Sequence, residues 1–236
     1  MKLEDLEHFK KWFTDYTSTY YTDDPVHDQP IKLKQEHTQR VCKEIVTLGQ
    51  ALNLPERDML LAETMALFHD VGRFEQYAVY GTFKDKASED HAKLGIKVLS
   101  KHNVLSTCSH KEQSLITRAI GYHNMRTLPD EKDERCLFFA RLLRDAEKLD
   151  IWRVFIEYYG RQETEPNATI VWGLPDKDLC SPAILEALHD RRMADLKDMA
   201  TLNDFKLLQI SWVYDLNFAP TFRTVYQRRS RKADSC

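Results

Sequence analysis

The stretch "LFHDVGRFEQYAVYGTFKDKASEDH", residues 67–91, places two polar side chains, His69 and Asp70, directly after an apolar run. Ala62, Met65 and Ala66 lead to His69 in steps of three and four, which is the period of one face of a helix. An adjacent His and Asp at such a point is either an ordinary exposed helix end or a pair of metal ligands. The rest of the chain decides between these two interpretations.

Helix-periodic segments fill most of the 236 residues. Seven glycines and eight prolines interrupt them, and alternating β patterns are nearly absent, so the sequence predicts an all-α protein. A bundle of five to six helices is expected over residues 1–160, with a C-terminal helical accessory segment over 161–236 that caps it. The expected helices run over residues 3–20, 31–53, 56–69, 88–101, 110–123, 133–158, 181–200 and 203–216.

Composition excludes several classes of protein. The formal net charge of −3 gives no basic surface for nucleic acid, so no specific nucleic-acid partner is expected. Apolar runs stay well short of the ~18 residues of a membrane span, and the charged N-terminus does not resemble a signal peptide. Five scattered cysteines without a C-x-x-C motif are typical of reduced thiols. We therefore expect a cytoplasmic protein with no membrane association.

Several of the expected helices carry a His or an Asp on their apolar face. In the helix over 31–53, His37 occupies the position between Leu33 and Val41 in the apolar stripe. The same holds, on three other helices, for His91, His123 and Asp145. Burying four imidazoles and two carboxylates costs on the order of several kcal/mol unless they share partners. A metal ion would satisfy them together, and these donors suit Mn, Fe, Co, Ni or Zn.

The ordered set His37, His69–Asp70 and Asp145 resembles the H…HD…D signature of the HD-domain metal-dependent phosphohydrolases. The surrounding residues fit as well: "LKQEHTQRV" at the first His, "LFHDVGRF" at the dyad and "RDAEKLD" at the last Asp. The resemblance covers residues 31–150. A second doublet, His189–Asp190, lacks this neighbourhood and is expected on a solvated helix face.

The resemblance implies a ligand set for one or two divalent ions. One ion would be held by His37, His69, Asp70 and Asp145. His91 and His123 match the two extra histidines of HD subfamilies that bind two ions, with Asp70 bridging them. Alternatively, these two histidines bind substrate phosphate as cations in a one-metal enzyme.

The resemblance also implies an activity, the hydrolysis of a phosphate ester of a nucleotide or similar small molecule. A metal would lower the pKa of a bound water from 15.7 towards ~7, and Asp70 or Asp145 would take its proton. Cations are expected to neutralise the phosphate, although each could equally form a surface ion pair. These candidates are Arg73, Lys148, Lys34 and Arg192.

Two further interpretations stay open. Some HD-fold proteins use similar ligands for a mixed-valent diiron centre, so an oxygenase acting on a small polar substrate is the alternative function. A non-catalytic sensor would require a broken ligand set, whereas all six positions are filled here. The segment "GYHNMRTLP" lacks the GYP motif of the cyclic-dinucleotide phosphodiesterases, so that substrate is not expected. The aromatic-rich segment 73–90 is expected to wall the pocket as a linker, and a homodimer is an open option.

Overall fold

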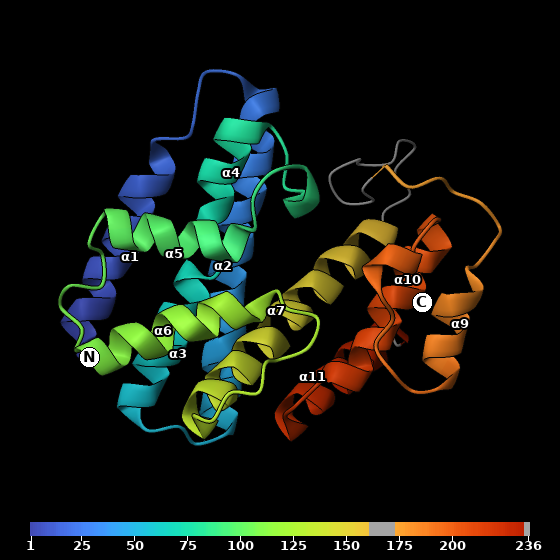
Figure 1. The fold of residues 1–236 in the computed structure, drawn as a ribbon. Coiled ribbons are helices and arrows are strands. Elements are labelled where there is room, and N and C mark those ends of the chain that lie inside the picture. The colour runs from blue at the N-terminus through green and yellow to red at the C-terminus, as the bar shows by residue number, and fades with distance from the viewer. Residues whose placement is uncertain (161–172, 234–236) are drawn as a thin grey trace. The chain divides into compact units, whose positions relative to one another are not determined.

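The computed structural model describes residues 1–160 and 173–233 (Figure 1). Throughout these two ranges the regular structure consists of α-helices and short 3₁₀ turns without a strand, which confirms the all-α class. The chain divides into two compact units, Met1–Glu147 and Lys148–Cys236. The division falls inside one long helix rather than at residue 160. Among the described helices, none is long and apolar enough to cross a bilayer.

The first unit is a bundle arranged around one central helix, α3. Its helices are α1 (Leu3–Ser18), α2 (Pro25–Ala51), α3 (Glu56–Phe68), α4 (Gly72–Tyr80), α5 (His91–Lys101), α6 (His110–His123) and the first half of α7 (Glu134–Gly160). Helices α1, α2 and α6 all pack on α3, so nearly every residue from Leu60 to Phe68 is buried. A helix covered on several sides must be apolar all round. The C-terminal end of α3 therefore places the His69–Asp70 dyad in the interior of the bundle.

Polar caps determine where the neighbouring helices begin. The Asp24 side chain accepts from the backbone N–H of Val26 at 2.9 Å, so α2 starts at Pro25, six residues earlier than expected, and includes Pro30. Asp90 accepts from Lys93 N and makes His91, rather than residue 88, the start of α5. The capping box of Ser109 and Glu112 begins α6, as the sequence predicts.

Part of the segment expected to be a linker is a helix. Residues 72–80 form α4, and Gly81 ends it in the left-handed conformation with φ of 64°. Phe74 anchors this helix, because its fully buried ring packs edge-on against Phe13 with centroids 5.8 Å apart. The remaining linker contains a single 3₁₀ turn, Asp85–Ala87.

The second unit also differs from expectation in its helix boundaries. Beyond the second half of α7 it contains α9 (Pro182–His189), a 3₁₀ turn at Leu196–Asp198, α10 (Leu202–Ser211), a 3₁₀ turn at Trp212–Asp215 and α11 (Ala219–Ala233). The helix expected over 181–200 ends at His189, and Arg191 has a positive φ of 56°. Helix α11 was not predicted, because its polar, basic sequence resembles a solvated tail. Phe155, Leu202 and Phe205 form a small buried cluster in this unit.

Two glycines allow α4 and α5 to meet at their backbones. A Cβ atom added to Gly72 would overlap the carbonyl oxygen of His91 and the backbone nitrogen of Gly95. Backbone atoms cannot rotate away as a flexible side chain can. The approach of these two helices places the first residue of α5 beside the end of α3, so Gly72 supports both the fold and the position of His91.

We expect Gly72→Ala to lower the free energy of unfolding by ~3 kcal/mol, because overpacking against backbone forces the two helices apart. Gly121→Ala is the matched control. Its added Cβ would meet the side chain of Ile96 at an ordinary 3.4 Å, and alanine favours a helix over glycine by up to ~1 kcal/mol. Urea denaturation of both variants measures the difference. Equal stability of the two variants would show that the helices do not approach this closely.

Candidate metal centre

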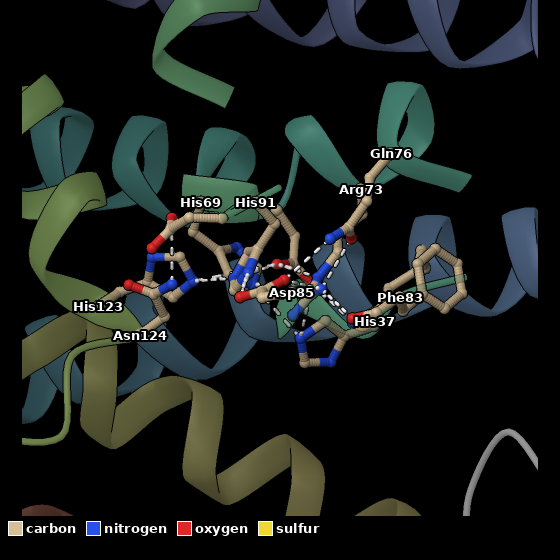
Figure 2. Close-up of polar contacts among 12 residues, drawn as sticks. His37, His69, Arg73, Gln76, Phe83, Asp85, His91, His123 and Asn124 are labelled. Atoms are coloured by element: carbon tan, nitrogen blue, oxygen red, sulfur yellow. Dashed lines mark hydrogen bonds and ion pairs between the residues drawn. The ribbon is translucent and has the colours of Figure 1, made fainter. Parts of the chain in front are cut away.

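Five of the six predicted metal ligands converge in the interior of the first unit (Figure 2). His37 comes from the middle of α2, and His69 and Asp70 come from the link between α3 and α4. His91 is the first residue of α5, and His123 is the last residue of α6. Each of the five is at most 7% exposed. Residues separated by up to 86 positions (123 − 37) thus meet at one point.

Asp70 stands between two pairs of histidines. Its Oδ2 lies 3.8 Å from His37 Nε2 and 3.7 Å from His69 Nε2. Its Oδ1 lies 3.4 Å from His91 Nε2 and 3.9 Å from His123 Nε2. The structure therefore contains two groups that could each hold a metal ion, and the two groups share this one carboxylate.

Hydrogen bonds fix the orientation of three of the imidazoles. The Nδ1 of His69 contacts the carbonyl oxygen of Ala66 at 2.8 Å, and the Nδ1 of His123 contacts that of Ile120 at 2.6 Å. His91 Nδ1 contacts a carboxylate oxygen of Asp85 at 2.7 Å. All three partners can only accept, so each Nδ1 carries the proton. In the neutral rings each Nε2 then presents a lone pair towards Asp70.

This arrangement places the lone pairs of His91 and His123 against each other. His91 Nε2 and His123 Nε2 are 3.0 Å apart, and His69 Nε2 is 3.3 Å from His37 Nε2. Asp70 Oδ1 is buried and accepts no hydrogen bond, and its ion-pair partner Arg73 Nε lies 3.4 Å away. Such a concentration of unsatisfied acceptors is unfavourable unless a cation lies among them. Nitrogen and oxygen donors without a cysteine suit a divalent transition metal, so the residues fit the group that the sequence implies.

A comparison with known protein families matches residues 35–152 to the HD domain. This match covers 118 of the 236 residues (152 − 35 + 1) and includes all five clustered ligands. The chain belongs to the HD-domain family. Proteins of this family are generally metal-dependent phosphohydrolases that bind divalent metals. Searches among curated proteins and among solved structures return no match.

The charge state of the HD centre suits metal binding. Burial lowers the pKa of His69, His91 and His123, which favours their neutral forms. Burial alone would raise the pKa of the Asp70 carboxyl, but the nearby cations of Lys34 and Arg73 and the adjacent imidazoles hold it well below its usual range. Neutral imidazoles around an ionised carboxylate are the form that coordinates a metal.

The sixth predicted ligand, Asp145, is fully buried on α7 but belongs to neither of the two groups found among the described residues. Its role as a ligand stays a prediction. Glu147, two residues further along α7, lies in the electrostatic field of the cluster. Burial opposes its ionisation, yet His123 and His69 lower the pKa of its carboxyl below the usual range.

Helix geometry separates these two acidic positions. Residues two apart on an α-helix point roughly 200° away from each other, so Asp145 and Glu147 cannot both face the histidines. The sequence interpretation followed the stripe of Leu142, Asp145 and Leu149 and did not consider Glu147. An equally regular stripe contains Leu143, Glu147 and Asp150, and this spacing is the signal that could have identified it.

Two of the predicted phosphate-binding cations lie at the HD centre. Lys34 Nζ donates to Asp70 Oδ2 at 2.8 Å and lies 5.5 Å from the centre of the Phe83 ring. Arg73 donates through Nη1 to the Phe83 carbonyl at 2.6 Å and to Asp85 Oδ1 at 2.9 Å. Arg73 holds the linker through Nη1, and its Nε lies 3.4 Å from Asp70 Oδ1, so both Lys34 and Arg73 pair with the Asp70 carboxylate.

The other two predicted cations belong to the second unit. Lys148 is buried and donates to Asp215 Oδ2 at 2.7 Å. Arg192 pairs with Asp190 and Glu186 on the surface of its own unit. Their roles at the substrate stay predictions. The side chain of His189 in the second HD doublet is 90% exposed, in agreement with the solvated position expected for it.

Proposed function

We propose that the chain is a metal-dependent phosphohydrolase whose Asp70 carboxylate bridges two divalent ions. The observation that supports this most strongly is that two pairs of imidazole Nε2 atoms lie 3.4–3.9 Å from the two oxygens of one buried carboxylate. His37 and His69 would hold the first ion with Asp70 Oδ2. His91 and His123 would hold the second ion with Asp70 Oδ1. A carboxylate of α7 would complete the set.

The chain's own residues supply the rest of the chemistry. Bound divalent ions would make hydroxide available near neutral pH and neutralise phosphate charge. Glu147 is ionised at neutral pH and lies near His69 and His123, so it is suited to accept a proton from water. Lys34 supplies a positive charge beside Asp70 that would attract and orient a phosphoryl group.

The substrate we propose is a small phosphorylated molecule, such as a nucleotide. Lys34 and two aromatic rings, Tyr77 of α4 and Phe83 of the linker, support this class. Tyr77 and Phe83 pack with their ring centres 5.0 Å apart, and the Lys34 ammonium lies by the Phe83 ring. A cation next to a pair of packed aromatic rings can bind phosphate on one side and a planar base on the other.

A hydrolysis panel tests the proposal. Metal is removed with a chelator, and Mn, Fe, Co, Ni or Zn is added back before phosphate release from nucleotides and aryl phosphates is measured. We expect hydrolysis that disappears with the metal, returns with at least one of these ions and is lost in His69→Ala. The exposed His189→Ala is the control and should match the parent. Protein that binds iron and consumes O₂ but hydrolyses none of these phosphate esters would identify an oxygenase instead.

A further inference from the structure

One carboxylate contacts the metal centre without belonging to either ligand group. Asp85 lies in the linker between α4 and α5, and its Oδ2 accepts the Nδ1 proton of His91 at 2.7 Å. Figure 2 shows Asp85 pointing into the cluster of histidines. Its side chain is 32% exposed, so the linker forms an outer wall of the centre at this point.

Two side chains of α4 hold this carboxylate in place. Arg73 Nη1 and Gln76 Nε2 each donate to Asp85 Oδ1 at 2.9 Å. Gln76 is fully buried, and its two N–H groups are shared between Asp85 Oδ1 and two further acceptors at 2.8 Å, Ser88 Oγ and the Glu89 carbonyl. The linker is thus bound to α4 at several points. Oδ1 receives both donors from α4, and Oδ2 is left to accept from His91.

His91 needs such a partner because of its place in the fold. His69 and His123 each bond through Nδ1 to the carbonyl three residues earlier, in the preceding helical turn. His91 is the first residue of α5, so no helical turn precedes it. Asp85 supplies the missing acceptor from the linker. The proton then stays on Nδ1, and Nε2 presents its lone pair towards Asp70 Oδ1 at 3.4 Å.

We propose that Asp85 is a positioning residue that sets the tautomer and orientation of His91, and through it the affinity for the second ion alone. The inference rests on the proposed two-ion function for its metal-binding part. It also gives Arg73 a role in holding Asp85 rather than substrate phosphate. Asp85 accepts from His91, which belongs to the second group alone, so the effect should fall on the second ion.

Asp85→Asn is a sharp test because the surrounding donors dictate how the amide must lie. Arg73 and Gln76 both require an acceptor at the Oδ1 position, which places the amide nitrogen opposite His91. That nitrogen is a donor, so it should move the His91 proton from Nδ1 to Nε2. Long-range ¹H–¹⁵N NMR of the metal-free protein reports the tautomer directly. We expect Nδ1–H in the parent and Nε2–H in the variant.

Titration calorimetry with Mn²⁺ or Zn²⁺ then measures both sites. We expect Asp85→Asn to weaken the affinity for one ion by ~10–100-fold and to leave the affinity for the other ion unchanged. Glu89→Gln is the matched control, because it removes the same charge from the same linker while its side chain pairs with Lys97. The control should keep the parent tautomer and both affinities.

The outcomes separate this inference from the proposed function. An Nε2–H tautomer of His91 in the folded parent overturns the proposed role of Asp85. This measurement uses the parent protein, so it does not depend on how well the variant folds. If Asp85→Asn lowers the affinity for both ions equally, the proposed role of Asp85 is also overturned, because general damage to the fold would act on both sites. A parent with the Nδ1–H tautomer that binds no divalent ion supports the positioning of His91 and contradicts the proposed function.

Discussion

Asp70→Ala should release both metal ions and reduce phosphate-ester hydrolysis by ~10³-fold or more. The reason is that Asp70 is the one residue common to both ligand groups, with one oxygen directed at each pair of histidines. The fold should survive, because Lys34 is 20% exposed and can turn its ammonium to solvent once its partner is gone. Elemental analysis, circular dichroism and steady-state kinetics measure these three effects.

Two further variants make the Asp70 result specific. Asp70→Asn keeps the shape of the side chain but replaces one acceptor oxygen with a donor, so it should retain at most one ion. Asp190→Ala changes the aspartate of the surface HD doublet and should keep both ions and full activity. A folded Asp70→Ala protein with two bound ions would contradict the bridging arrangement.

Glu147→Gln should weaken metal binding and lower activity by ~100-fold or more, whereas Asp145→Asn should keep the metal content of the parent. Both changes are isosteric and both remove one charge from α7, so they differ mainly in the direction of the side chain. The imidazoles of His123 and His69 lower the pKa of the Glu147 carboxyl, and neither Glu147 nor Asp145 belongs to the two groups. Because only one of the two side chains can face the histidines, we expect the metal loss at position 147 alone.

Metal content and kcat of the two variants decide the assignment, and their melting temperatures serve as a control for folding. Asp145 is fully buried, so Asp145→Asn can lower stability without changing metal content. Metal loss in Asp145→Asn together with retention in Glu147→Gln would restore Asp145 as the ligand that the sequence resemblance implies.

Helix periodicity was sufficient to find most of the cluster. His37 was identified as the missing member of an apolar stripe, and His91 and His123 lie on stripes of their own. Those positions are buried in the structure and face Asp70. The method works here because the ligands are held by helices, whose side-chain directions follow from spacing alone.

Periodicity was insufficient for a contact outside a regular helix and for a choice between two competing stripes. Asp85 is in the linker, and its contact with His91 depends on how Arg73 and Gln76 hold that linker. Glu147 and Asp145 lie on two equally regular stripes of α7, so spacing could not choose between them. The short helix α4 was missed because the nine residues of Gly72–Tyr80 directly follow the turn that contains the dyad.

Counting the metal ions in the parent and in the His91→Ala/His123→Ala double variant tests the two-ion arrangement most directly. Both proteins are loaded with the same ion, freed of excess and analysed for metal per chain, with folding checked by circular dichroism. The parent should hold about two ions and the double variant about one, because the group of His37, His69 and Asp70 remains intact. An unchanged metal content in the folded double variant would contradict a second ion at His91 and His123.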